Sequence, residues 1–580
     1  MKDKVRLYNW LFKLFIGLLA VGILTTFVAF DKGISNINYY LTGGIAVISG
    51  ILAYYFFKKF KREKDIVYVK ENWPQGLKRK RNIESIKKYF SLTRNEDSYF
   101  IDDQTWSDLD MDDVYSKIES TLTTPGEQVL YYLLRNPIFS EDELKNRDRI
   151  IEHFQKNDAN RENLQVILLG LGKQVHGNIL DLFSEEKIDT RFKFVYDILG
   201  IAPLVILPFY FVFGAKILLP FILIYMINNG VHYKLSPKII NQVNSIAYLG
   251  NLITISKNII KENYNELTKY GDEIKTNIKD IKDIDKHSVY INRVEGLDFF
   301  GDYVNILLLT RLRSYYKVVD KIYDYKDNIK EIYRIIGEID SLLSIAAYRE
   351  RIQDYSKPNF NHDNKSLDLV EAVHPLITEP IPNSISIKNS GIILTGSNMS
   401  GKSTFLRTVA INSLFAQTIY TTLTKGYEGT FFKLLTSLSP EDSVKKGKSY
   451  YLGEAEALLR ILNSFEEDIP TLTMIDEIFR GTNPLERISA SAEILEYMSR
   501  KNTLALVATH DLELTEISNE NFQCYYFSED VDESEGLKFD YTIKNGVSPT
   551  RNAIKLLKYI GYPSDIIDGA NDRISKLLKK

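Results

Sequence analysis

The chain has 580 residues, which exceeds the size of a single-core domain, so several domains are expected. Its formal net charge is −3 with 26% charged residues, which excludes a globally basic nucleic-acid binder and leaves room for local basic patches. The single cysteine, Cys524, excludes intramolecular disulfides and argues against a metal site built from cysteines.

Two apolar stretches near the amino terminus, residues 11–30 and 37–57, are each long enough to cross a hydrocarbon layer of about 30 Å. No A-x-A-like cleavage site follows the first stretch, so we favour a transmembrane hairpin over residues 1–60 to a cleaved signal peptide. Basic residues flank both outer ends of the hairpin. The positive-inside rule then predicts a multi-pass protein of the cell membrane whose later domains are cytoplasmic.

Residues 61–112 read as a basic juxtamembrane linker that contains the run Lys-Arg-Lys-Arg at 78–81. Anionic lipid headgroups attract such clusters, and DNA would attract them too. We favour lipid because the cluster follows a membrane span.

Residues 113–355 read as a helical core with long helices. Pro125 and Gly126 open an amphipathic helix that Pro137 ends. Two apolar stripes at i, i+3/i+4 spacing mark longer helices between about 235 and 355. Their members are Ile274, Ile278, Ile281 and Ile284, and then Ile322, Tyr325, Ile329, Ile332, Ile336 and Ile339.

A second apolar block at residues 195–231 interrupts this core. Its two halves, 198–213 and 217–227, are each shorter than about 20 residues and contain prolines. We favour two short or tilted membrane helices, although a buried core hairpin has the same pattern. Charged residues occur only at the edges, which favours an anchor over a pore.

The stretch from residue 391 to 407 predicts strand, loop and helix in succession. An apolar run at 392–394 precedes residues 396–403, which fit the phosphate-loop pattern G-x-x-x-x-G-K-[S/T]. Glycines let backbone N–H groups approach phosphate oxygens, Lys402 adds a point charge, and Ser403 would hold Mg²⁺. The candidate nucleotide-binding residues are Gly396, Ser397, Asn398, Met399, Ser400, Gly401, Lys402, Ser403 and Thr404.

Two further apolar runs end in side chains that suit phosphate chemistry. Residues 471–477 read as a buried parallel strand that delivers Asp476 and Glu477 to its carboxyl edge. Asp476 would bind Mg²⁺ with Ser403, and Glu477 would polarise the attacking water. Residues 503–510 form a second such run, and its last residue, His510, could sense the γ-phosphate. The candidate catalytic residues are therefore Glu477, His510 and Lys402.

Three segments, residues 395–404, 475–483 and 508–514, resemble the ATPase motifs of the MutS family, the DNA mismatch-repair ATPases of the ABC superfamily. The Asn-Met pair in the loop and Arg-Gly-Thr after Asp-Glu are more discriminating than the phosphate loop alone. The resemblance implies an ABC-type α/β P-loop domain over residues 356–580 that hydrolyses ATP with Mg²⁺ and ends in dimerisation helices. Residues 371–376 resemble the start of that domain, and His374 within them reads as structural.

Residues 448–454 are similar to the segment with which a MutS subunit reaches its neighbour's nucleotide. By that resemblance Ser449 contacts the γ-phosphate in trans, which implies a homodimer; a helix-capping serine is the alternative. The long helices resemble MutS levers. Residues 122–137 resemble the opening of the MutS core, and residues 340–347 the place where the levers return to the ATPase.

The sequence also departs from the family. Only about 112 residues precede the core, and no Phe-x-Glu wedge occurs among them, so mismatch recognition is not expected. Ser397 stands where the family usually has proline, and Ser400 where it often has glycine. Neither position supplies a phosphate-binding side chain, so nucleotide binding should be intact.

We predict a membrane-anchored MutS-family ATPase in which ATP at a dimer interface moves the levers, acting on DNA near the membrane. One alternative is an ATP-driven membrane machine, which predicts polar residues facing each other inside the apolar blocks. Another is a nucleotide-gated scaffold for a protein partner, which predicts lever surfaces without basic patches.

Overall fold

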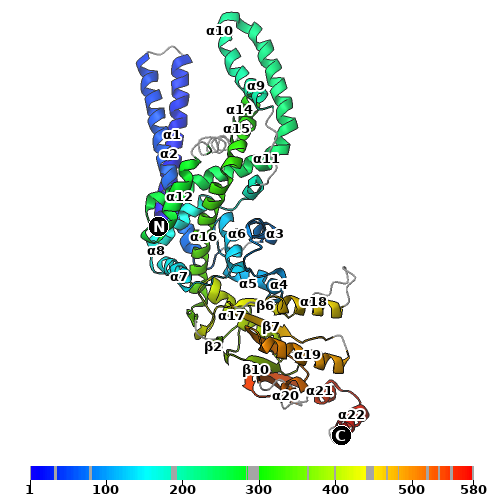
Figure 1. Cartoon of the computed structure of the whole chain (residues 1–580). Coiled ribbons are helices and arrows are strands. Elements are labelled where there is room, and N and C mark those ends of the chain that lie inside the picture. Colours follow the sequence, from blue (N-terminus) through cyan, green and yellow to red (C-terminus); the bar gives the residue numbers. More distant parts are fainter. Residues whose placement is uncertain are drawn as a thin grey trace. The chain divides into compact units, whose positions relative to one another are not determined.

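The computed structural model describes residues 2–31, 36–76, 81–183, 192–281, 284, 300–361, 365–397, 400–438, 450–465, 468–480, 483–517, 521–532, 536–548 and 553–577. The chain forms two compact units (Figure 1). The first, helical unit comprises Met1–Asn82, Ser120–Val129 and Ile150–Ala347. The second unit comprises Ile83–Glu119, Leu130–Arg149 and Tyr348–Lys580 and contains the β-sheets.

The helical unit begins with a long antiparallel hairpin of α1 (Lys2–Asp31) and α2 (Asn36–Asn72), drawn in blue in Figure 1. The two helices pack closely, since a Cβ on Gly22 would lie 3.0 Å from the Cβ of Ala46. Thr26 Oγ1 donates a hydrogen bond of 2.9 Å to Thr42 Oγ1 across the hairpin. The apolar side chains facing away from this contact are exposed, and both helices are long and apolar enough to cross a membrane.

Where the sequence predicts a linker over residues 61–112, the structure has helices. α2 continues without a break to Asn72; Val69 is buried there, and Ile66 and Val67 are half-buried between the basic residues. This end of α2 contacts α8 (Asp158–Leu169), and Lys70 Nζ lies 2.9 Å from Glu162 Oε2. Three more helices follow in the second unit, namely α3 (Ile83–Thr93), α4 (Asp103–Asp108) and α5 (Met111–Ile118).

The second apolar block also forms a helical hairpin. Its ascending arm is α9 (Lys193–Ile206), η2 (Leu207–Phe209) and α10 (Tyr210–Phe213), and η3 (Gly214–Ile217) makes the turn (Figure 1). The descending arm is α11 (Leu218–Glu262), one helix of 45 residues where the sequence predicts an apolar segment that ends at 227. Residues 214–235 of this arm are long and apolar enough to span a membrane.

The remaining helices of this unit carry the predicted apolar stripes. Ile274, Ile322 and Ile336 are buried, as predicted, whereas Tyr325 is exposed. Tyr325 departs from its stripe because it lies at the junction where one helix ends and the next begins. The stripe residues lie on or just after α12 (Thr268–Asp280) and on α15 (Thr310–Asp324) and α16 (Lys326–Ile352). The other helical elements here are α7 (Glu141–Lys156), which is shared between the two units, η1 (Ile179–Phe183), η4 (Asn265–Leu267) and α14 (Phe300–Leu308).

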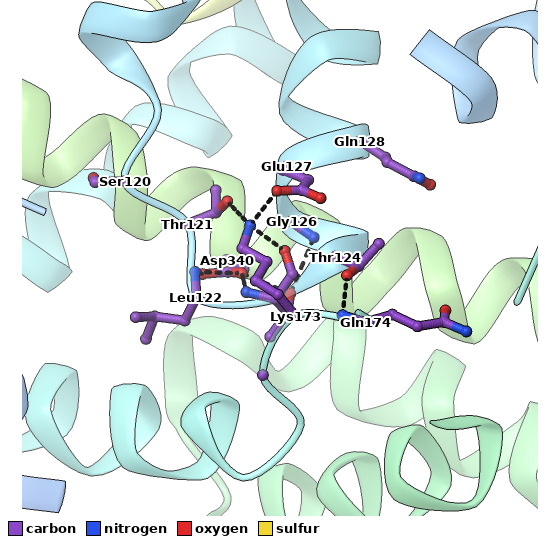
Figure 2. A network of polar contacts seen from close by, with 12 residues as sticks. Ser120, Thr121, Leu122, Thr124, Gly126, Glu127, Gln128, Lys173, Gln174 and Asp340 are labelled. Atoms are coloured by element: carbon purple, nitrogen blue, oxygen red, sulfur yellow. Dashed lines mark hydrogen bonds and ion pairs between the residues drawn. The ribbon is translucent and has the colours of Figure 1, made fainter. Parts of the chain in front are cut away.

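A buried polar network joins α16 to the start of α6 (Thr124–Arg135) (Figure 2). The Asp340 carboxylate accepts hydrogen bonds from the N–H groups of Leu122 and Thr123 and from Thr123 Oγ1. Lys173 Nζ lies beside it and donates to Thr123 O at 2.7 Å and to Glu127 Oε2 at 2.8 Å. The turn from Thr123 to Gly126 is therefore fixed by the carboxylate of Asp340, which comes from a distant helix.

The second unit contains two sheets. A four-stranded sheet has the order β1 (Asn359–Phe360), β5 (Gly426–Gly429), β2 (Ser366–Ala372) and β3 (Asn383–Lys388). A six-stranded sheet has the order β10 (Gly536–Asn545), β9 (Phe522–Asp532), β4 (Gly391–Thr395), β8 (Thr503–Ala508), β7 (Thr471–Asp476) and β6 (Lys433–Ser437). From β9 to β6 its neighbouring strands are parallel, and only the β10–β9 pair is antiparallel.

Helices pack against the six-stranded sheet. The most deeply buried is α17 (Lys402–Thr418), which follows β4, as the sequence predicts, and has mostly buried side chains along its length. Residues of α18 (Tyr450–Leu462), α19 (Pro484–Ser499) and α20 (Glu513–Ile517) join one hydrophobic core with β7 and β8. The chain closes with α21 (Ala553–Ile560) and α22 (Ser564–Leu577) (Figure 1).

Candidate active site

Three neighbouring parallel strands bring the predicted residues to one edge of the sheet. Asp476 of β7 pairs in register with Ala508 of β8, which pairs with Leu394 of β4. Strands that run in parallel present their carboxyl ends at the same edge. The phosphate-type loop after β4, the two acids that end and follow β7, and His510 after β8 therefore meet there.

The loop between β4 and α17 depends on two glycines with left-handed backbone angles. Gly396 has φ 137° and Gly401 has φ 111°. A Cβ on Gly396 would lie only 2.7 Å from the carbonyl oxygen of Phe527, so a larger residue would not fit. Ser400 Oγ donates to Ser397 O at 2.8 Å and so helps to close the loop. Asn398 and Met399 lie outside the described residues.

Lys402, the first residue of α17, is buried and folds back over the loop. Its Nζ donates to the carbonyl oxygens of Gly396 at 2.7 Å and Ser397 at 2.8 Å. Burial lowers the Lys402 pKa to about 8, a shift that Asp476 and Glu477 oppose. The ammonium is therefore a poorly solvated charge that an anion in the cavity would stabilise.

Ser403 and Asp476 contact each other directly. Ser403 Oγ donates a hydrogen bond of 2.5 Å to Asp476 Oδ2. A hydroxyl and a carboxylate oxygen held together are the ligand types that Mg²⁺ prefers, so this pair fits the predicted metal site. Thr404, the next residue, lines the same cavity and accepts a hydrogen bond at its carbonyl from Thr408 Oγ1.

Glu477 has partners on both carboxylate oxygens. Its Oε1 lies 3.1 Å from His510 Nε2, and its Oε2 lies 2.6 Å from Arg480 Nε. Burial and the Lys402 charge lower the His510 pKa, so the imidazole is neutral near pH 7. A neutral His510 ring that carries its proton on Nε2 donates a hydrogen bond to Glu477. In this tautomer Nε2 cannot accept a hydrogen bond from Lys402, whose Nζ lies 3.5 Å away.

These residues surround a cavity of about 920 Å³. Lys402, Ser403, Asp476, Glu477 and Arg480 line its polar side. Its other lining residues include the apolar side chains Ile377, Pro380, Ile381, Phe405 and Tyr541. A cavity of this size and mixed lining suits a ligand that combines a polyanion with a flat, less polar part.

His374 lines the cavity as well, and it behaves as a neutral structural residue. Its Nδ1 accepts a hydrogen bond from the backbone N–H of Leu376 at 3.3 Å. Burial and the nearby Arg407 charge lower the His374 pKa to about 4.

The sequence analysis did not predict two residues of the site, Arg480 and Glu454. Arg480 contacts both acids, and Glu454 of α18 accepts a hydrogen bond from the Arg480 backbone N–H at 3.0 Å. Arg480 stands three residues after Glu477 within the Arg-Gly-Thr motif, which was a usable signal for it. Ser449, which precedes α18, lies outside the described residues.

Comparison with known proteins identifies the domain that carries this site. The family described as MutS domain V matches residues 392–578. The chain contains a MutS domain V. The MutS match includes Lys402, Ser403, Asp476, Glu477 and His510, the residues that the fold brings to one sheet edge.

Curated relatives agree with this assignment. "DNA mismatch repair protein MutS" of Petrotoga mobilis is 30% identical over 272 residues, which are 45% of this chain and 33% of the relative. The Persephonella marina protein of the same name is 32% identical over 253 residues, 42% of this chain and 29% of the relative. The Staphylococcus haemolyticus protein is 30% identical over 274 residues, 45% and 30% respectively. The chain thus spans about a third of the length of these MutS proteins.

Proposed function

We propose that this chain binds ATP with Mg²⁺ in the 920 Å³ cavity and hydrolyses it to ADP and phosphate. The observation that carries the proposal is the convergence of Lys402, the Ser403–Asp476 pair and the Glu477–His510 pair at one sheet edge. A buried ammonium, a hydroxyl–carboxylate pair and a carboxylate–imidazole pair are what phosphoryl transfer to water requires.

Each residue has a role in this mechanism. Lys402 exchanges its two loop carbonyls for phosphate oxygens, and the start of α17 directs its backbone N–H groups to the same oxygens. Ser403 and Asp476 would hold Mg²⁺, which supplies positive charge to the triphosphate. Glu477 accepts a proton from the attacking water, and His510 orients the Glu477 carboxylate through its Nε2 contact.

The apolar lining of the cavity favours a nucleotide over inorganic phosphate as the ligand. Ile377, Ile381 and Tyr541 line the same cavity as Lys402. A base can pack against these side chains while the phosphates extend to the loop. Inorganic triphosphate should accordingly bind more weakly than ATP.

The direct test is nucleotide binding measured beside turnover. Lys402→Ala should weaken binding of a fluorescent ADP analogue at least tenfold, because the loop loses its buried charge. Glu477→Gln should bind the nucleotide normally and lose at least 100-fold in turnover, because the proton acceptor is gone. Lys501→Ala and Glu493→Gln change exposed residues of the same domain and should behave like the parent protein. If Glu477→Gln hydrolysed ATP as fast as the parent protein, Glu477 would not be the base.

We propose further that the two apolar hairpins anchor the chain in the cell membrane with the MutS domain in the cytoplasm. Among the described residues, three helical stretches are long and apolar enough to span a bilayer, and their outward side chains, such as Leu24 and Phe27, are largely exposed. The chain should stay in the membrane fraction after alkaline carbonate extraction. Protease added to the cytoplasmic face should cleave the MutS domain, and release by carbonate would contradict the anchor.

The names of the relatives suggest a further role that can be tested. They are DNA mismatch repair proteins, and we propose that this chain is a dimer whose long helices act on DNA. Binding to mismatched, branched and plain duplexes over a salt series, with and without ATP, tests this role. Absence of binding at low salt would remove DNA and leave a nucleotide-gated scaffold or a membrane machine. Among the described residues, Thr26 and Thr42 form one contact of the kind that a membrane machine predicts, and both groups are uncharged hydroxyls.

A further inference from the structure

The turn that follows β7 has an unfavourable backbone. Glu477 has φ 67° and Phe479 has φ 61°, both in the left-handed region that side chains other than glycine rarely adopt. Backbone conformations of this kind persist where neighbouring contacts hold them, and they gather at functional sites. The turn therefore needs partners that keep it in place.

Arg480, at the end of this turn, neutralises both acids. Its Nε lies 2.6 Å from Glu477 Oε2, and its Nη2 lies 3.5 Å from Asp476 Oδ2. Nη2 also donates to the Asp476 carbonyl oxygen at 2.8 Å. The guanidinium thus supplies the positive charge that a divalent cation would supply to the same two carboxylates.

Helix α18 holds this turn from outside. Glu454 is 3% exposed, and its Oε2 accepts the Arg480 backbone N–H at 3.0 Å. The Tyr451 ring packs on the Phe479 ring with 5.4 Å between centroids. Both contacts come from the first turns of α18, directly after Ser449.

We propose that Arg480 and Glu454 are positioning residues that form a latch. In the latched state the Arg480 guanidinium pairs with the carboxylates of Asp476 and Glu477. Helix α18 holds Arg480 in this position through Glu454 and Tyr451. Movement of α18 releases Arg480, and the two acids then become available to Mg²⁺ and to the attacking water. This inference rests on the proposed function, because it concerns how the same site is switched on.

The test measures the Mg²⁺ concentration that gives half-maximal binding of a fluorescent ADP analogue to the full chain. Glu454→Ala removes the hydrogen bond to Arg480 and should lower this concentration about fivefold, the worth of one ordinary hydrogen bond. Glu454→Gln keeps an oxygen acceptor and should stay within twofold of the parent. Leu459→Ala changes an exposed residue of α18 outside these contacts and should also match the parent.

Two further variants keep the latch testable if Glu454→Ala does not fold. Tyr451→Ala removes a largely exposed ring and should shift the midpoint in the same direction as Glu454→Ala. Arg480→Gln should shift it further, and adding Glu454→Ala to Arg480→Gln should have no extra effect, because both act through one side chain. An unchanged or raised midpoint in Tyr451→Ala, or additive effects in the double variant, would overturn the latch. A parent protein that binds no ADP at any Mg²⁺ concentration would instead refute the proposed ATP site.

Discussion

The Asp340 carboxylate accepts a hydrogen bond of 2.6 Å from the Thr123 hydroxyl, across 217 residues of sequence. Thr123 Oγ1 in turn accepts the N–H of Gly126 at 3.0 Å (Figure 2). The contact explains why threonine and glycine occur in the segment that resembles the opening of the MutS core, and aspartate in the segment that resembles the return of the levers. Each supplies one part of a single buried joint within the helical unit.

We expect Asp340→Asn to destabilise the helical unit by about 2–4 kcal/mol. An amide keeps one oxygen acceptor and turns an NH₂ group toward the backbone N–H groups of Leu122 and Thr123, which already donate. Chemical denaturation followed by circular dichroism measures the loss. Asp327→Asn, which changes an exposed residue of the same helix, should cost less than about 0.5 kcal/mol. Equal stabilities of the two variants would show that the joint contributes little.

Gly126→Ala should be destabilising by about 1–3 kcal/mol, because overpacking forces side chains or backbone to move. A Cβ at this position would lie 2.1 Å from Asp340 Oδ2. Gly271→Ala makes the same change in α12, where no atom lies within 4 Å of the new Cβ, and alanine favours the helix there. The two variants should therefore change the midpoint of thermal unfolding in opposite directions.

Nucleotide affinity should fall as the pH rises above 8. The free Lys402 pKa is about 8, and bound phosphates favour the charged lysine, so binding takes up a proton above that pH. The dissociation constant for ADP should be flat from pH 7 to 7.5 and then rise by up to about tenfold per unit above pH 8. Isothermal titration in buffers of different ionisation enthalpy reports the proton uptake directly. A rise that persists in Lys402→Ala would assign it to another group.

The second unit should lose stability as the pH falls from 6.5 toward 4. His374 has a folded pKa of about 4 and an ordinary value of 6.5 when unfolded, so the unfolded chain binds the extra proton in this window. The loss from His374 alone is up to about 3 kcal/mol. Protonation would also remove the Nδ1 acceptor of the Leu376 N–H. Denaturation of His374→Gln at pH 7 and pH 5 should show a smaller difference than denaturation of the parent.

The amino-terminal hairpin should be sensitive to side-chain size at one glycine. Gly22→Leu would push α1 away from Ala46, whereas a Cβ on Gly44 meets no atom within 4 Å, so Gly44→Leu should be accommodated. In a Cys524→Ser background, cysteines at Thr26 and Thr42 should form a disulfide readily, because the two hydroxyl oxygens lie 2.9 Å apart. Gly22→Leu should reduce the cross-linking yield severalfold and Gly44→Leu should not. Equal yields would show that the helices do not pack through Gly22.

Local patterns predicted the parts of the fold that depend on neighbours in sequence. β4, its loop and α17 appear where glycines and apolar spacing indicate, as do β7, β8 and the stripes of α15 and α16. The basic residues after the first hairpin suggested a linker, and the structure has a helix there because Val69 is buried. Charge alone could not show that burial.

Contacts between distant segments could be predicted from the sequence where motifs mark both partners, and not elsewhere. The pairing of Asp476 with Ser403 follows from strand order, which the motifs imply. The roles of Arg480 and Glu454 depend instead on where α18 lies against the turn after β7. Tyr325 was misassigned because a helix ends there and its apolar stripe does not continue.

Because α2 is one continuous helix, its length sets the distance between the proposed membrane span and the contact with α8. Its 37 residues give a rod of about 55 Å, of which the proposed span at 37–57 takes about 32 Å. Residues 58–72 of α2 add about 22 Å and include Lys70, which contacts Glu162 of α8. A continuous helix, and not a flexible linker, therefore connects the proposed span to the rest of the helical unit. With the proposed membrane anchor, helix length would set the height of the helical unit above the lipid headgroups.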